Sequence, residues 1–261
     1  MTEARARRVT SSLSAGLFHL LQPKGQRARV PDGERVYIVG DIHGRLDLLD
    51  RLLRIISEHA QSAPERRTLI FVGDYIDRGA DSRGVIDRLL APPPGFQARH
   101  LRGNHDQAML DFIRDPLAWR GWQNFGARET LLSYGVRPPL LDNAEAMTAA
   151  RDELVVTLPA SHVAFLEGLE LCAEVGDYFV VHAGVRPAVA LKDQSAQDML
   201  WIRDEFLKSN TEFGKIIVHG HTPHPRVLRQ RNRIGIDTGA YETGRLSALV
   251  LEGDTVGLLQ T

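Results

Sequence analysis

"LIFVGDYIDRG" (residues 69–79) begins as an apolar run and ends as a cluster of charge. The run 69–72 is typical of a buried strand, and Asp74, Asp77 and Arg78 follow it between glycines. A solvated turn is the ordinary explanation for two carboxylates and a guanidinium after a single strand. The choice between a turn and a binding site therefore depends on what the rest of the chain places beside them.

Strand-like and helix-like segments alternate around this stretch. Residues 35–40, 67–73 and 96–103 are typical of strands, and leucines and isoleucines at helical spacing indicate helices at 45–60 and 82–90. This strand–helix–strand–helix–strand order predicts parallel strands joined by right-handed crossovers.

The remainder of the chain predicts more helices and a second sheet. Residues 105–168 are typical of a helical insertion, and the short apolar runs after it predict hairpins, interrupted by one helix at 195–209. We expect an α/β fold of four layers, in which two mixed sheets pack face to face between helices. A single domain over 35–261 would follow a basic N-terminal tail, residues 1–34, that is mobile or loosely docked.

The composition is that of a soluble globular protein. Hydrophobic residues make up 43% and charged residues 25% of the 261 residues, and the formal net charge is −1. This balance does not indicate a nucleic-acid partner, and no apolar run reaches the roughly 18 residues that span a bilayer. The single cysteine, Cys172, cannot form an internal disulfide, so we expect a cytoplasmic protein.

Five apolar runs end in side chains that bind metals. Ligands of open α/β sheets bind outside the carboxyl ends of the strands, so we expect these five ends to converge on one cleft. The side chains that follow the runs are Asp41 and His43, Asp74, Asn104 and His105, His182, and His219 and His221.

These side chains suit a pair of metal ions. Asp41 and His43 stand two residues apart in an extended segment, so both can reach one ion. Asp74 follows the middle strand of the first three and can bridge two ions, with Asn104, His182 and His221 on the second ion. Carboxylate, amide oxygen and imidazole without thiolate favour Mn, Fe, Zn or Co. Sites of this kind catalyse in-line displacement at phosphorus.

The motifs GDIHG, GDYIDRG, GNHD, HAG and GHT, at residues 40–44, 73–79, 103–106, 182–184 and 220–222, resemble those of a known enzyme family. They resemble the phosphoprotein phosphatase family of calcineurin-like metallophosphoesterases. The greatest likeness is to bacterial and phage serine/threonine phosphatases of the protein-phosphatase-1 type. The resemblance implies a metallophosphatase-type β-sandwich flanked by helices. It also implies two divalent ions, with manganese expected first and Fe, Zn, Co or Ni as alternatives.

The resemblance also implies a role for each residue of these motifs. The first metal would be held by Asp41, His43 and Asp74, and the second by Asp74, Asn104, His182 and His221. His105 would be the general acid, and Asp77 would orient its imidazole. Arg78, Arg203 and Asn104 would bind the substrate phosphate. For Arg203, which lies in the expected helix beside Asp204 and Glu205, an ordinary surface ion pair is the alternative.

The expected activity is hydrolysis of a phosphomonoester, with a metal-bridging hydroxide attacking phosphorus in line. The substrate would be a phosphorylated protein, with serine/threonine or broad specificity, or a small phosphate ester. A symmetrical diadenosine tetraphosphate hydrolase is the main alternative, because it shares the scaffold and most motifs. A phosphodiesterase or nuclease is less favoured for two reasons. Pro223 stands directly after GHT, at the position where many wider metallophosphoesterases carry a second metal-binding histidine, and the chain lacks a basic balance. A metal-binding module without catalysis would not need the complete set of His105, Asp77 and two arginines.

Overall fold

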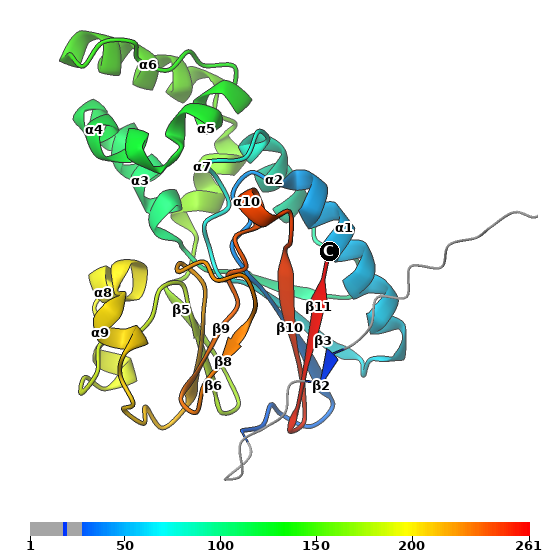
Figure 1. Ribbon diagram of the computed structural model, residues 1–261. Coiled ribbons are helices and arrows are strands. Elements are labelled where there is room, and N and C mark those ends of the chain that lie inside the picture. Colours follow the sequence, from blue (N-terminus) through cyan, green and yellow to red (C-terminus); the bar gives the residue numbers. More distant parts are fainter. Residues whose placement is uncertain (1–17, 20–27) are drawn as a thin grey trace, which may run out of the picture.

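Two β-sheets face each other in the computed structural model, which describes residues 18–19 and 28–261 (Figure 1). The first sheet has the strand order β1-β11-β10-β2-β3-β4 and the second the order β5-β6-β7-β9-β8. The strands are β1 Phe18–His19, β2 Glu34–Val39, β3 Arg66–Phe71, β4 Gln97–His100, β5 Cys172–Val175, β6 Tyr178–Val181, β7 Ile216–His219, β8 Leu228–Arg229, β9 Arg233–Gly235, β10 Ser247–Glu252 and β11 Thr255–Gln260.

Both sheets are mixed, as the sequence predicts. Strands β2, β3 and β4 are parallel, and so are β6, β7 and β9, whereas every pairing that involves β1, β5, β8, β10 or β11 is antiparallel. The carboxyl ends of each parallel set therefore lie at one edge of its sheet. The helices are α1 Leu46–His59, α2 Ser82–Leu89, α3 Asn104–Arg114, α4 Trp119–Trp122, α5 Ala127–Ser133, α6 Ala144–Thr157, α7 Ala160–Glu167, α8 Ala196–Trp201, α9 Asp204–Leu207 and α10 Ala240–Thr243.

The expected four layers follow from the way the strands bury both faces. In β2, Val36 and Ile38 point into the space between the sheets, while Tyr37 and Val39 pack under α1 and α2. In the second sheet, the outer face of β6 packs against α8 and α9. Because side chains alternate between faces, a strand buried on both sides reads as a continuous apolar run.

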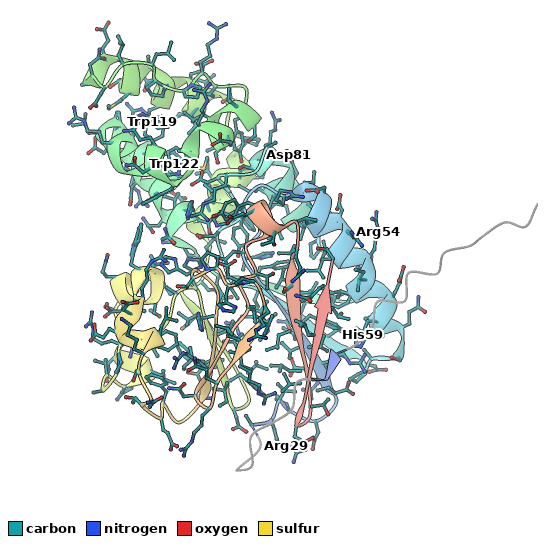
Figure 2. All side chains as sticks on the ribbon, viewed as in Figure 1. Arg29, Arg54, His59, Asp81, Trp119 and Trp122 are labelled. Atoms are coloured by element: carbon teal, nitrogen blue, oxygen red, sulfur yellow. The ribbon has the colours of Figure 1, made fainter. Side chains whose placement is uncertain are left out.

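The helices α3 to α7 stand at one end of the two sheets (Figure 1). They connect β4 to β5 and occupy residues 104–167. Their inner face is aromatic: the Phe112 ring centroid lies 5.3 Å from that of Trp122 and 5.7 Å from that of Trp119. Figure 2 shows both tryptophans in this helical segment.

The prediction of one helix at 195–209 is wrong. Two short helices, α8 and α9, occupy this range, and Arg203 lies between them with φ −128° and ψ −104°. Ile202 and Phe206 both pack on the outer face of the second sheet, and the break in the helix allows both to reach it.

Most of the expected basic tail, residues 1–34, lies outside the described residues. In the part of it that is described, β1 pairs with β11, and Val30 is buried, with its N–H bonded to the Gly253 carbonyl at 3.0 Å. None of the helices in the described part of the chain has the length and apolarity needed to cross a bilayer.

Candidate metal centre

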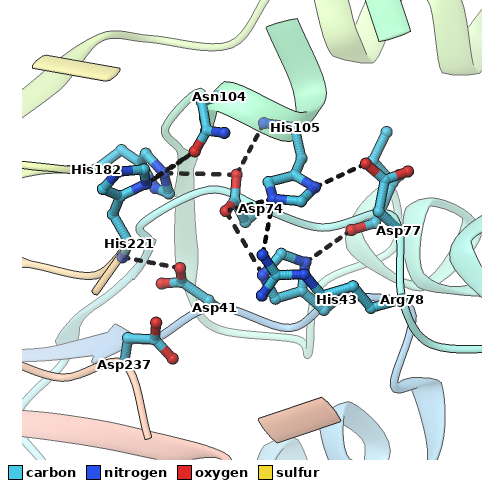
Figure 3. A network of polar contacts seen from close by, with 12 residues as sticks. Asp41, His43, Asp74, Asp77, Arg78, Asn104, His105, His182, His221 and Asp237 are labelled. Atoms are coloured by element: carbon cyan, nitrogen blue, oxygen red, sulfur yellow. Dashed lines mark hydrogen bonds and ion pairs between the residues drawn. The ribbon is translucent and has the colours of Figure 1, made fainter. Parts of the chain in front are cut away.

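The carboxyl ends of β2, β3, β4, β6 and β7 meet at one place between the sheets (Figure 3). The loops after these strands bring seven of the predicted site residues together, and each is at most 5% exposed. These residues are Asp41, His43, Asp74, Asn104, His105, His182 and His221.

The backbone at this site is held in an uncommon conformation. Six residues other than glycine have positive φ in the described part of the chain, and only Ala188 lies outside the site motifs. Such residues cost on the order of 1–3 kcal/mol each and persist where surrounding contacts hold them. The other five are His43 (47°), Asp74 (51°), Asp77 (72°), Arg78 (67°) and His221 (64°).

Asp106 holds the loop after β3 against the start of α3. Its buried carboxylate accepts hydrogen bonds from the backbone N–H groups of Gly103 (2.8 Å), Asp74 (2.9 Å) and Tyr75 (3.1 Å). Burial raises the pKa of Asp106 to about 7, and the Asp74 charge adds to this effect. The last residue of GNHD therefore supports the site rather than entering it.

The Asp74 carboxylate lies between two groups of histidines. Its Oδ2 is 3.6 Å from His43 Nε2 and 3.7 Å from His105 Nε2, while its Oδ1 is 3.5 Å from His182 Nε2. Burial alone would raise the pKa of Asp74, but the surrounding histidines favour the carboxylate and hold the pKa well below its usual value. Two possible metal positions therefore share Asp74: one with His43 and His105, the other with His182 and His221.

The Nε2 atoms of His182 and His43 are hydrogen-bond acceptors, yet each faces another acceptor instead of a donor. His182 Nδ1 lies 3.0 Å from the Val72 carbonyl and can only donate to it, so Nε2 of the neutral ring carries a lone pair. That lone pair faces the Asn104 Oδ1 at 3.0 Å. His43 Nδ1 likewise lies 2.9 Å from a carbonyl, that of Ile76, so its Nε2 presents a lone pair to Asp74. A cation between these atoms relieves the repulsion of acceptor by acceptor.

The histidines are also in the protonation state that metal binding requires. Burial lowers the pKa of His43 to about 3 and that of His221 to about 2, so both rings are neutral at neutral pH. His221 Nδ1 lies 2.9 Å from Asn104 Oδ1 and 3.2 Å from His182 Nε2. Neutral imidazole is the ligand form that binds metal.

Asp41 supplies the most direct sign that a cation fits here. Its Oδ2 accepts the backbone N–H of His221 at 2.9 Å, but its buried Oδ1 has no partner among the described residues. Burial raises the pKa of Asp41, and the charges of Asp237 and Asp74 raise it further. A β-carbon on Gly220 would lie 1.9 Å from Oδ1, so only glycine leaves room for this carboxylate. The donor set as a whole suits two divalent ions.

His105 and Asp77 form a buried pair beside the first metal position. His105 Nδ1 lies 2.7 Å from Asp77 Oδ2, and Arg78 Nη2 lies 3.3 Å from His105 Nε2. Burial alone would lower the pKa of His105, but the charges of Asp74 and Asp77 outweigh it and the pKa is raised. A guanidinium so close to Nε2 disfavours a metal ion at that nitrogen, although His105 stands near enough to Asp74 to be a ligand.

Several contacts of this pair are invisible in the sequence. Asp77 also accepts hydrogen bonds from Trp122 and Thr130, and Arg78 stacks over the Tyr241 ring at 4.4 Å. These partners lie 45 or more positions along the chain and belong to no motif. The one signal in the sequence that could have pointed to these partners is the presence of hydrogen-bonding side chains near an aromatic cluster.

Arg203 lies at the edge of the site. It is exposed, and its charge lowers the pKa of His182 and His221, although burial and nearer charges contribute more. The neighbours that could have paired with it are taken: Asp204 pairs with Lys208 at 2.8 Å, and Glu205 pairs with Arg186 at 2.8 Å. Among the described residues Arg203 has no ion pair. The alternative that Arg203 forms an ordinary surface ion pair with Asp204 or Glu205 therefore has no support in the structure.

His219 and Asp237 lie next to the site without joining either histidine group. His219 Nδ1 lies 3.0 Å from the Gly220 carbonyl, and its ring packs on Phe206. Asp237 accepts the Gly239 N–H at 2.8 Å, and burial raises its pKa to about 6. Its negative charge raises the pKa of Asp41, so Asp237 acts on the site through charge alone.

Comparisons with known proteins agree with this geometry. A family model described as calcineurin-like phosphoesterase matches residues 34–250. Serine/threonine-protein phosphatase 1 of Salmonella typhimurium is 29% identical over 227 residues, which cover 85% of this chain and 94% of that protein. Serine/threonine-protein phosphatase 2 of Escherichia coli is 30% identical over 222 residues, covering 81% and 90%.

Another relative has a different named activity. Bis(5'-nucleosyl)-tetraphosphatase PrpE [asymmetrical] of Anoxybacillus flavithermus is 27% identical over 235 residues, covering 81% of this chain and 88% of that protein. A solved structure described as "a putative diadenosine tetraphosphatase" superimposes with a TM-score of 0.62 at 23% identity, covering 90% and 98% of the two chains. At this identity the structural likeness shows the fold alone.

Proposed function

Since the chain belongs to the calcineurin-like phosphoesterase family, and is thereby a metal-dependent phosphoesterase, we propose that it hydrolyses phosphomonoesters of serine and threonine side chains in proteins. The two protein phosphatases of Salmonella and E. coli support this substrate class, since each aligns over more than four-fifths of the chain. Manganese is the metal we propose first.

The observation that carries this proposal is the division of the Asp74 carboxylate between the neutral, buried His43 on one side and the neutral, buried His182 and His221 on the other. We assign Asp41, His43 and Asp74 to one ion and Asp74, Asn104, His182 and His221 to the other. Divalent ions bound there supply a nucleophile near neutral pH and stabilise charge on the phosphoryl oxygens. The unpartnered Oδ1 of Asp41 supports its place among these ligands.

The residues around the metals carry the rest of the reaction. Arg78 and Arg203 hold the phosphate, because a planar guanidinium matches two phosphate oxygens at once. Asn104 contributes its amide. His105 holds a proton on Nε2 and gives it to the leaving oxygen as that oxygen separates from phosphorus. The Asp77 carboxylate, 2.7 Å from His105 Nδ1, orients the ring and favours its protonated form.

Asymmetrical hydrolysis of a dinucleoside tetraphosphate is a second candidate. The PrpE relative supports it, since it aligns over nearly the same share of the chain as the protein phosphatases. The sequence alone suggested symmetrical cleavage as the alternative, whereas this relative is named as asymmetrical. The two modes differ in products, because asymmetrical cleavage of diadenosine tetraphosphate gives ATP and AMP, and symmetrical cleavage gives two ADP.

A side-by-side assay decides between these substrates. The full chain with added Mn²⁺ is given a phosphoserine peptide, a phosphotyrosine peptide, a mononucleotide and diadenosine tetraphosphate, and kcat/KM is measured for each. We expect the phosphoserine peptide to give the highest value and chelation to abolish all four activities. A clear preference for the tetraphosphate would replace the proposed substrate, and full activity after thorough chelation would contradict the metal dependence.

A further inference from the structure

Asp77 is held by the helical segment as firmly as by His105. The indole N–H of Trp122 in α4 donates to Asp77 Oδ2 at 2.9 Å, and the Thr130 hydroxyl in α5 donates to Oδ1 at 2.6 Å. Oδ2 is therefore shared between Trp122 and His105 Nδ1, while Oδ1 belongs to Thr130. The carboxylate is fully buried, so these bonds fix its position.

The same segment holds the turn that carries Asp77. The Asp77 N–H lies 2.9 Å from Thr130 Oγ1, and the Arg78 N–H donates to the Gly126 carbonyl at 3.2 Å. Asp77 and Arg78 both have left-handed φ angles, 72° and 67°, which residues with a β-carbon rarely adopt in succession. Contacts from outside the loop are needed to keep such a turn in place.

The indole of Trp122 is itself locked. It is 1% exposed and packs against Phe112 and Trp119, whose ring centroids lie 5.3 Å and 6.0 Å away. Trp119 shares this aromatic cluster but has no hydrogen bond to Asp77 among the described contacts. This packing fixes the direction of the Trp122 N–H, which points at the Asp77 carboxylate.

We propose that Trp122 and Thr130 are positioning residues for the general acid, acting on His105 through Asp77. This inference rests on the proposed function, since it requires His105 to protonate the leaving oxygen. With both Asp77 oxygens held, the imidazole is oriented so that its Nε2 points toward Asp74 and Arg78 (Figure 3). The proposed function places the phosphate ester on this side of the ring. The helices outside the sandwich are then part of the catalytic apparatus.

The test uses two substrates of similar shape that differ in their need for a proton. Nitrophenolate leaves phosphorus with little need of protonation, whereas the phenolate of phenyl phosphate is more basic and benefits more from a general acid. A residue that positions His105 therefore changes the ratio of kcat/KM for p-nitrophenyl phosphate to that for phenyl phosphate. A residue that only stabilises the fold lowers both values together.

Four variants of the full chain separate the two roles. Thr130→Val removes a hydrogen bond to Asp77 with little change of shape. Trp122→Phe removes the other bond and also part of a buried ring, a loss of volume that Trp119→Phe reproduces in the same cluster. We expect Thr130→Val and Trp122→Phe each to raise the ratio about ten-fold with unchanged metal content. Thr130→Ser keeps the hydroxyl and should restore the wild-type ratio. Trp119→Phe perturbs the same aromatic cluster and should leave the ratio unchanged. Unchanged ratios in both Trp122→Phe and Thr130→Val would overturn the proposal.

His105→Asn distinguishes failure of this inference from failure of the proposed function. We expect His105→Asn to raise the ratio, and Trp122→Phe to raise it no further in that background, because both changes remove the same proton transfer. A further rise in the double variant would overturn the positioning role. If His105→Asn itself leaves the ratio unchanged, the general-acid assignment in the proposed function is wrong, and this inference falls with it.

Discussion

The Asp74 carboxylate makes polar contacts on both sides of the site. One carboxylate oxygen faces His43 and His105, the other faces His182, and the backbone N–H of His105 donates to Oδ1 at 3.1 Å. Asp41, by contrast, faces one side of the site and keeps one oxygen without a partner among the described residues. The proposed bridging role of Asp74 and the proposed single-ion role of Asp41 should therefore give different responses to substitution.

Asp74→Asn is expected to remove both metal ions, whereas Asp41→Asn removes one. The asparagine amide keeps the size of the side chain but loses the negative charge that both positions share. Metal analysis of the purified variants, after dialysis against trace Mn²⁺, measures the ions bound per chain. Equal metal loss in the two variants would contradict the bridging role of Asp74.

Arg203→Lys should lower kcat/KM at least ten-fold, which corresponds to roughly 1.4 kcal/mol. Lysine keeps the charge but cannot reproduce the two-point contact of a guanidinium with phosphate. Steady-state kinetics and inhibition by inorganic phosphate measure the change, and inhibition should weaken in parallel. Arg231→Lys, at an exposed arginine that pairs with Glu212, is the matched control and should behave as the wild type. Unchanged kinetics in Arg203→Lys would place the second phosphate contact elsewhere.

At the scale of elements, the loops after the strands position the site residues more directly than the strands do. Strands β2, β3 and β4 set three loops side by side, and close backbone contacts then hold the loops in register. Gly73 and Gly103 touch directly, since a β-carbon on Gly73 would lie 2.4 Å from the Gly103 nitrogen. The start of α3 is thereby pressed against the loop that carries Asp74.

Gly103→Ala is expected to destabilise the protein by about 1–3 kcal/mol and to reduce metal binding. A β-carbon at this position would lie 2.1 Å from Asp74 Oδ1 and 2.3 Å from its backbone nitrogen, and neither atom can move away freely. Urea unfolding and metal analysis measure the two effects. Gly121→Ala in α4 is the control, because its β-carbon would meet nothing within 4 Å and helix propensity makes it neutral or stabilising. Normal stability and metal content in Gly103→Ala would show that the loops can separate.

At the scale of the whole molecule, the sandwich buries several histidines in their neutral form. Burial lowers the pKa of His100 to about 4 and that of His219 to about 4 as well. His100 stacks on Phe71 with ring centroids 5.1 Å apart, away from the metal centre. Between pH 6.5 and 4 the unfolded chain binds a proton at such a residue and the folded chain does not, so stability falls as the pH falls through this range.

His100→Phe should therefore protect the protein from acid relative to the wild type. At pH 7 and above the histidine of the wild type and the phenylalanine of the variant are both uncharged. The difference in unfolding free energy between the two proteins then reflects packing alone. As the pH falls to about 4, the variant should gain up to about 3 kcal/mol over the wild type, because it has no proton to bind on unfolding. Urea unfolding of both proteins at several pH values measures this difference, and a difference that does not change with pH would contradict it.

The gathering of the site residues at one place could be predicted from the sequence because it depends on short spacings. The residues Asp41, Asp74, Asn104, His182 and His221 each follow an apolar run closely, and parallel strands place their carboxyl ends at one edge. The two mixed sheets and the outer helices followed from the same alternation of apolar segments. These features are local in the chain, so no knowledge of distant contacts was needed.

Only the tertiary structure decided how the site is held. The direction of each imidazole depends on backbone carbonyls such as that of Val72, which is 110 positions from His182. Trp122 and Thr130 reach Asp77 across 45 and 53 positions, and no spacing rule connects them. The break at Arg203 arises because neighbouring side chains must reach the second sheet. Hydrogen-bond partners and helix breaks depend on distances through space, and these exist only once the layers have packed.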